Sequence, residues 1–251
     1  MKPQQTQEPH SENVGVKTNS AKRLWTFFGK VSKLKPEMRI AEAFSELHPN
    51  KSKNLLDIQS FIVVVASEIT TFKEEMEDIG LSTHLDPTPY LKHEGVMRDF
   101  LQVLNFETSL NTKGRSFTPQ VLDVLEICDE VLSRSKYSFT LQEQDLVLMR
   151  KQLLELKAQL QDLPEWVQKS LIKLINEIDA ELSMVGIRGQ KSYEAVQEKL
   201  LYYAATSSPK AYGVVDKLAS ILANMNLVKK LDGKSLKQLQ LSNGTVDDNQ
   251  T

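Results

Sequence analysis

Residues 163–200, LPEWVQKSLIKLINEIDAELSMVGIRGQKSYEAVQEKL, contain a long apolar periodicity that is interrupted once. Before the interruption, apolar residues recur every three or four positions, at Val167, Leu171, Leu174, Ile178, Leu182 and Val185. The interruption is the sequence GIRG at residues 186–189, and helical spacing resumes after it. A three-and-four spacing is typical of one face of an α-helix, so the stretch predicts two helices joined at a short corner.

The same periodicity precedes this stretch and ends at a proline. Its apolar positions are Leu146, Met149, Leu153, Leu156, Leu160 and Leu163. Pro164 separates the two periodic runs and leaves room only for a tight turn, which predicts an antiparallel helical hairpin. We expect this apolar seam to close on the chain's own bundle. The alternative is a seam that also pairs with another chain.

The rest of the chain has helical spacing as well. Helices are predicted near residues 21–34, 37–47, 54–79, 89–106, 119–134, 141–161, 163–185, 190–206 and 209–230. The β-branched residues 61–65 could form a strand, but their flanks keep helical spacing and no second strand-like run offers a partner. The predicted fold is therefore all-α, a multi-helix bundle that contains a long antiparallel helical hairpin.

Four regions are expected along the chain. Residues 1–19 form a disordered leader and residues 236–251 a disordered tail, because neither can bury enough apolar surface to offset the entropy of ordering. Residues 20–135 form an N-terminal helical region. Residues 136–235 form the helical hairpin and its covering helices, packed with the preceding region. No low-complexity linker divides the two.

Composition limits the classes of function. The chain has 251 residues, 40% of them hydrophobic and 25% charged, with a net charge of -2, so it has no global attraction to nucleic acid or to an anionic membrane. Its one cysteine excludes an intrachain disulfide, and the polar N-terminus is unlike a secretory signal. We expect a cytoplasmic protein. Membrane-surface contact is not expected, and nucleic-acid binding would need a local patch.

The GIRG sequence permits two interpretations. It superficially resembles the GxxG loop with which K-homology domains clamp single-stranded nucleic acid. That loop lies between short helices flanked by strands, whereas here the preceding helix is long and no strand precedes it. We therefore favour a corner in which Gly186 ends one helix in the left-handed conformation and Gly189 lies near the start of the next. Arg188 would then cap carbonyls or remain solvated.

No sequence pattern indicates catalytic, cofactor-binding or metal-binding residues. The histidine spacings match no standard zinc arrangement, and no nucleophile or phosphate-loop motif occurs. Cys128 lies on the apolar side of an acidic helix, which predicts a buried, unreactive thiol. Glu177 and Glu181 share a helix face and are expected to be solvated.

Residues 21–35, AKRLWTFFGKVSKLK, are basic and amphipathic. Such a helix can begin a bundle, dock into the groove of a partner, or lie on a membrane. Together with the seam and GIRG, it supplies the predicted partner-binding residues: Arg23, Leu24, Trp25, Phe27, Phe28, Lys30, Leu153, Leu156, Leu160 and Arg188.

The leading functional hypothesis is a non-enzymatic helical interaction or regulatory module. It would act through the apolar seam and the basic N-terminal helix, with a protein partner or self-association. The alternatives are a helical nucleic-acid-acting protein, such as a nuclease without a recognisable motif, and a membrane-surface-associated helical protein.

Overall fold

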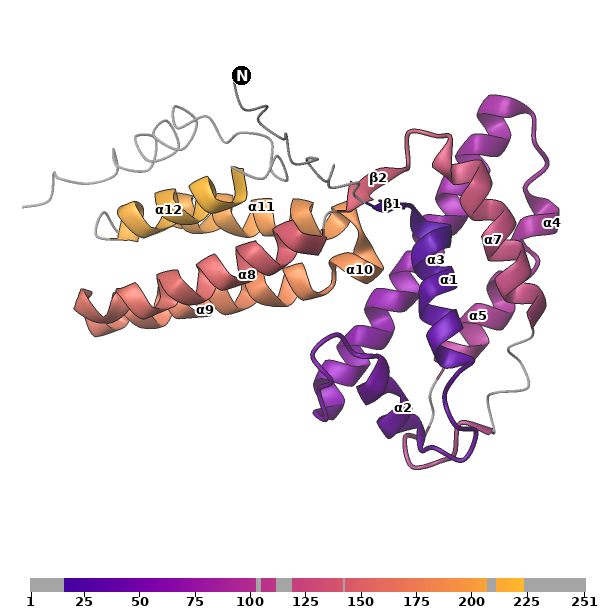
Figure 1. Cartoon of the computed structure of the whole chain (residues 1–251), viewed down its shortest axis with the longest axis horizontal. Helices are drawn as coiled ribbons and strands as arrows, with labels where there is room; N and C mark the ends of the chain where they lie inside the picture. Colours follow the sequence, from indigo (N-terminus) through magenta and orange to yellow (C-terminus); the bar gives the residue numbers. More distant parts are fainter. Residues whose placement is uncertain (1–15, 103–104, 112–118, 142, 207–210, 224–251) are drawn as a thin grey trace, which may run out of the picture.

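The computed structural model describes residues 16–102, 105–111, 119–141, 143–206 and 211–223. These residues confirm the predicted all-α fold, with one pair of short strands added to the helices (Figure 1). The predicted tail at residues 236–251 and residues 1–15 of the predicted leader lie outside this part of the chain.

The first group of helices is built around one long helix. Its members are α1 (Ser20–Val31), α2 (Ile40–Leu47), α3 (Leu55–Thr83), α4 (Thr88–Leu91), α5 (Glu94–Leu101) and α7 (Pro119–Ser133). Helix α1 packs against α3 and α7, and α5 packs against α3. The core is rich in aromatic rings, namely Phe27, Phe28, Phe44, Phe61, Phe72 and Phe100. Edge-to-face packing of rings such as Phe27 and Phe28, with centroids 5.1 Å apart, adds to the burial of apolar surface.

Helix α3 confirms the helical interpretation of residues 61–65. Phe61 and Val65 are buried on its inner face, as is Phe72 further along the helix. Among the described residues, α3 is also the helix long and apolar enough to cross a membrane by length and composition. Its buried face packs in the first core and includes Glu68.

The prediction of one continuous helix over residues 89–106 is wrong. This stretch is divided into α4 and α5, and the backbone leaves helical geometry at Gln102. The following segment lies beside the start of α2, where the carbonyl oxygens of Phe106 and Thr108 accept from the N–H groups of Ala41 and Ile40. The first N–H groups of a helix have no partner inside the helix. The loop therefore leaves the helical path and satisfies two of these donors on α2.

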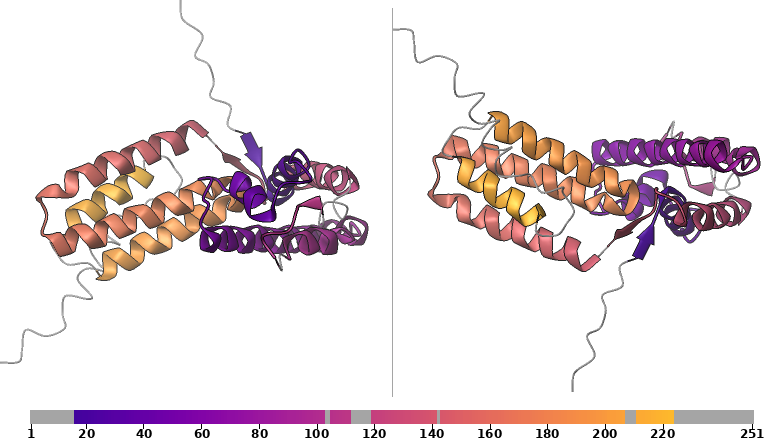
Figure 2. Two further views of the ribbon diagram at one scale, coloured as in Figure 1. Left: turned by 90° about the horizontal axis from the view of Figure 1, so that it is seen from below. Right: turned by 90° about the horizontal axis from the view of Figure 1, so that it is seen from above.

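The second group is a four-helix bundle that confirms the predicted hairpin. It contains α8 (Glu143–Ala158), the 3₁₀ turn η1 (Gln159–Asp162), α9 (Glu165–Ser183), α10 (Val185–Arg188), α11 (Gln190–Thr206) and α12 (Tyr212–Ala223). Helix α8 packs against α9 and α12, and α11 packs against the same two helices, so the four long helices form a closed ring. Figure 2 shows this bundle from two sides. The ring encloses a second apolar cluster.

A short two-stranded sheet lies near the point where the two groups meet. Strand β1 (Val16–Thr18) pairs antiparallel with β2 (Phe139–Leu141), with Lys17 opposite Thr140. Thr18 and Asn19 are buried. The predicted leader is therefore wrong at residues 16–19, because backbone pairing with β2 orders a polar segment that lacks apolar periodicity.

The buried apolar residues form two clusters along the chain. One extends from Ala21 to Leu132 and the other from Met149 to Ala219. The helices α1 and α3 of the first group contact α10 of the second (Figure 1). The division of the chain near residue 135 stays a prediction.

Candidate functional site

The predicted partner-binding residues of α1 mostly face inward. Arg23, Leu24, Phe27 and Phe28 are buried, and Trp25 is half-buried against the same core. Lys30 is the one residue of this predicted set on α1 that is exposed. Helix α1 is therefore a bundle helix in this structure, and a partner could reach its apolar face only after displacing α3 or α7.

The predicted seam residues of α8 and η1 are also internal. Leu153, Leu156 and Leu160 are buried in the second cluster, so the seam closes on the chain's own bundle. Pairing with a second chain through this seam would require the four helices to separate. The contribution of these leucines to partner binding stays untested.

The opposite side of α8 exposes apolar side chains that the sequence analysis missed. Val147, Leu148 and Leu154 are 69%, 45% and 67% exposed. We call this surface the outer face of α8, and define it by Val147, Leu148, Lys151, Leu154, Glu155 and Ala158. The sequence does indicate this face, because some apolar residues lie next to seam positions and not at them. Leu154 directly follows the seam residue Leu153, and Val147 follows Leu146.

The GIRG sequence forms a corner that contacts the first group of helices. Residues 185–188 make the single turn α10, and Gly189 ends it with φ of 57° and ψ of -132°. Ile187 and Met184 pack against the first apolar cluster. The predicted role of Gly186 is wrong, because only Gly189 among the described glycines has a positive φ. Arg188 pairs with Glu181 instead of capping carbonyls.

Gly189 is required by close packing as well as by its backbone angle. A Cβ atom at this position would lie 2.5 Å from a terminal guanidinium nitrogen of Arg23 and 2.8 Å from the ring of Phe139. A Cβ at Gly186 would meet nothing within 4 Å. The second glycine of GIRG therefore leaves space for the Arg23 side chain.

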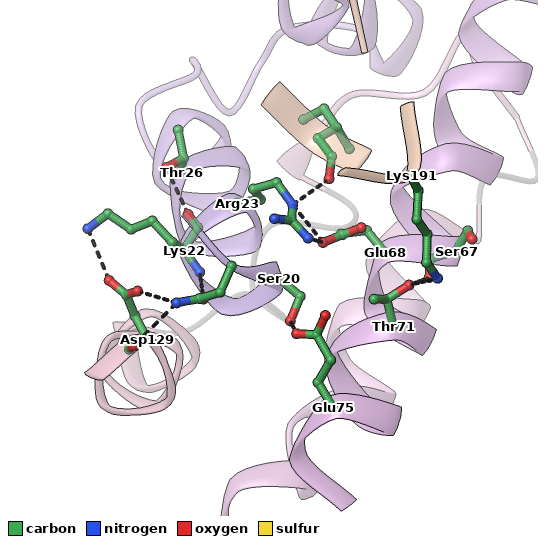
Figure 3. A network of polar contacts seen from close by, with 12 residues as sticks. Ser20, Lys22, Arg23, Thr26, Ser67, Glu68, Thr71, Glu75, Asp129 and Lys191 are labelled. Atoms are coloured by element: carbon green, nitrogen blue, oxygen red, sulfur yellow. Dashed lines mark hydrogen bonds and ion pairs between the residues drawn. The ribbon is translucent and has the colours of Figure 1, made fainter. Parts of the chain in front are cut away.

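Arg23 joins the two groups of helices through a buried ion pair. Its Nε atom donates to Glu68 Oε1 at 2.9 Å and to the carbonyl oxygen of Ile187 at 3.1 Å (Figure 3). The Arg23 and Glu68 side chains are only 6% and 2% exposed. Burial raises the pKa of Glu68 to about 7, and the attraction of Arg23 opposes this shift without cancelling it.

Neighbouring polar contacts extend this connection. The Lys191 ammonium donates to Thr71 Oγ1 at 2.7 Å, which links the start of α11 to α3. The Ser20 hydroxyl donates to the Glu75 carboxylate, as Figure 3 shows. Burial raises the pKa of Glu75, although this hydrogen bond opposes the shift. We call the set Ser20, Arg23, Glu68, Thr71, Glu75 and Lys191 the junction network.

A pocket of about 350 Å³ lies beside the junction network. Its lining includes cationic and anionic side chains and two aromatic rings. The lining residues are Arg23, Thr71, Glu74, Glu75, Lys136, Tyr137, Phe139, Arg188, Gln190, Lys191 and Glu194. Arg23 and Arg188 are already paired with Glu68 and Glu181. The cations of this pocket are therefore largely neutralised by carboxylates of the same chain.

The structure also shows the surroundings of Cys128 and of the pair Glu177 and Glu181. Cys128 is buried as predicted, and burial raises its pKa to about 12, so the thiol stays protonated. Glu177 and Glu181 are only partly exposed, and Lys199 bridges them at 3.8 Å from each carboxylate. The predicted solvated face is thus an ion-pair network. Within the described ranges, no group of His, Cys, Asp and Glu side chains could hold a metal ion.

The fold and these surfaces define a helical-bundle protein with two candidate sites, the outer face of α8 and the junction pocket. The chain matches no protein-family model, no curated protein and no solved structure.

The two glycines of GIRG should respond oppositely to alanine. We expect Gly189→Ala to lower the free energy of unfolding by about 2–4 kcal/mol, because it combines a positive φ with displacement of the Arg23 guanidinium. Gly186→Ala is the matched control and should be neutral or stabilising by up to about 1 kcal/mol, because Gly186 is helical with open space around it. Urea unfolding of both variants measures the difference. Equal effects would contradict the role assigned to Gly189.

Proposed function

We propose that the protein is a non-enzymatic helical interaction or regulatory module that binds a protein partner through the outer face of α8. The observation that carries this proposal is the exposure of Val147, Leu148 and Leu154 on the side of α8 opposite its buried seam. Single exposed apolar residues are normal on protein surfaces. Three within about two turns of one helix are a set of contacts that a partner can cover.

The bundle supports this face in a form suited to binding. Helix α8 packs against α9 and α12, and its buried residues Met149, Leu153 and Leu156 anchor it in the second cluster. Arg150 adds a paired contact to Asp179 of α9, with Nε 2.6 Å from Oδ1. A rigid helix loses little conformational entropy on binding, so more of the gain from apolar burial remains as affinity.

Partner binding through α1, which the sequence predicts, is less well supported by the structure than binding through the outer face of α8. Docking through its apolar face would expose Phe27 and Phe28, which lie in the first core. Exposing such side chains costs roughly 1.5–3 kcal/mol each. The outer face of α8 is accessible without any such rearrangement.

A capture experiment with one surface variant tests the proposal. We expect full-length protein to retain a stoichiometric protein partner from nuclease-treated native extract, and Leu154→Lys to weaken that binding at least about tenfold. The unfolding free energy of the variant should change by less than about 0.5 kcal/mol, because Leu154 is mostly exposed. Mass spectrometry identifies the retained chains, and titration of the identified partner gives the affinity.

Leu56→Lys is the matched control, since Leu56 is similarly exposed but lies on α3. Equal losses in the two variants, or no loss in Leu154→Lys, would contradict the assignment to α8. The alternative of a nucleic-acid-acting protein would use the junction pocket, where Lys136 and Arg188 are paired with Asp78 and Glu181 and Lys191 donates to Thr71. Retention of nucleic acid when nuclease is omitted, with no protein partner, would support that alternative instead.

A further inference from the structure

We propose that the outer face of α8 binds the same face of a second copy of this chain, with the two α8 helices antiparallel about a two-fold axis. This inference rests on the proposed function and names the partner for the same surface. A two-fold interface uses one patch on both copies, so the patch must be complementary to itself. The outer face of α8 meets that condition in both its apolar and its charged residues.

The residues of this face divide into two sides. Side chains three, four or seven residues apart share a helix face. Val147, Leu154 and Ala158 therefore follow one edge of the face, whereas Leu148 and Glu155 follow the other edge. Lys151 lies between them, four residues from both Val147 and Glu155. The apolar residues of this edge span about three turns, with Lys151 between Val147 and Leu154, and Glu155 lies beside them.

In an antiparallel pair related by a two-fold axis, each residue before the axis lies opposite a residue of the second copy that is equally far after it. With the axis at the level of residue 153, residues equally far before and after it face each other across the interface. Leu154 then lies beside Leu154 of the second copy near the axis, and Val147 lies close to the level of Ala158. The apolar edge of one copy thus packs on the apolar edge of the other. A large side chain lies opposite a small one at both ends, which favours close packing.

The charges of the face are complementary in the same arrangement. Lys151 lies level with Glu155 of the second copy, and Glu155 lies level with its Lys151, so the interface forms two ion pairs. Within one chain, Lys151 Nζ lies 3.9 Å from Glu155 Oε1 and both side chains are exposed. This weak contact can be exchanged for one across the interface. A parallel pairing would place like charges opposite each other, so charge favours the antiparallel arrangement.

The other charged residues between Val147 and Ala158 do not interfere. Arg150 is bound to Asp179, and Lys157 donates to Asn176 at 3.1 Å, so both point toward α9. The outer face therefore carries one cation and one anion between its apolar residues. Because these two charges sum to zero, the outer faces of two copies do not repel each other through their net charge.

Charge reversal tests this geometry with the full chain. We expect sedimentation equilibrium of the wild-type protein at micromolar to submillimolar concentration to give a monomer–dimer equilibrium. Lys151→Glu places two acidic residues opposite each other at both sites, and Glu155→Lys places two lysines there. Each single variant should raise the dissociation constant by on the order of tenfold.

An equimolar mixture of the two variants is the decisive measurement. In the heterodimer, positions 151 and 155 are both acidic in the first variant and both lysine in the second, so opposite charges face each other at both sites. The mixture should therefore regain affinity to within a few-fold of the wild-type protein. Lys169→Glu, which disrupts a similar exposed pair with Glu165 on α9, is the matched control and should not change the mass. Circular dichroism checks that every variant is folded.

Three outcomes would overturn the second-copy proposal: a wild-type monomer throughout this range, a dimer that neither reversal weakens, or single variants whose mixture does not recover. None of them decides the proposed function. A monomer whose capture of a different protein is lost in Leu154→Lys would leave the interaction module in place with another partner. Absence of dimerisation, together with capture that does not depend on Leu154, would remove both proposals.

Discussion

We expect Leu156→Asp to abolish the native melting of the four-helix bundle. Leu156 is 4% exposed and lies in the second cluster. Loss of a buried leucine costs about 2–5 kcal/mol, and an aspartate at the same place adds an unpaired charge in an apolar core. The sum approaches the whole stability of an ordinary domain, about 5–15 kcal/mol, so we expect the second group of helices to be unfolded at room temperature.

Leu154→Asp is the matched control for this prediction. It introduces the same charge two residues away on the same helix, but at a side chain that is 67% exposed. Thermal unfolding followed by circular dichroism should show near-native melting for Leu154→Asp and a lost transition for Leu156→Asp. Native melting of Leu156→Asp would contradict the burial of the seam.

The parts of the fold that follow from the sequence are those with strong local patterns. The seam leucines, the hairpin and the GIRG corner all follow from three-and-four spacing and from the positions of Pro164 and two glycines. Such patterns identify the buried side of each helix. They do not tell whether a helix is apolar on its other side as well, which is why the outer face of α8 was missed.

The junction could not be predicted because its contacts are distant in sequence. Arg23 and Glu68 are 45 residues apart, and Arg23 and Ile187 are 164 residues apart. In the sequence, Arg23 is one cation of a basic amphipathic helix, and nothing local distinguishes it from Lys22 or Lys30. The sequence predicts Arg23 on a binding surface, whereas tertiary packing places its guanidinium under Gly189. The strand pair of residues 16–18 and 139–141 was missed for the same reason.

The junction network also makes stability depend on pH. Glu68 has a pKa of about 7 in the folded protein against a usual 4.5, so the folded protein binds this proton more tightly than the unfolded chain. Its contribution to stability is therefore fully present below about 4.5 and is lost as the pH rises through about 7. The raised pKa of Glu75 acts in the same direction. The charged groups that face Glu68 are Arg23, Glu75 and Lys191.

Arg23→Met should therefore destabilise the protein strongly at high pH and weakly at low pH. Removing the guanidinium leaves the Glu68 carboxylate buried without its cation, which costs about 3–5 kcal/mol when the carboxylate is ionised. At about pH 5 Glu68 is mostly protonated with or without Arg23, so much of this cost disappears, whereas at about pH 8 the variant must either bury an unpaired carboxylate or take up a proton. Urea unfolding at both pH values measures the difference.

Two further variants separate charge from packing in this prediction. Lys22→Met on the same helix removes a cation that is partly exposed and paired with Asp129, so it should cost less than about 1 kcal/mol at either pH. Adding Glu68→Gln to Arg23→Met removes the buried charge and should recover most of the stability lost at about pH 8. An Arg23→Met cost that is equal at both pH values, or that Glu68→Gln does not reduce, would show that Arg23 acts through packing alone. The ion pair would then contribute nothing to the attachment of the GIRG corner to α1 and α3.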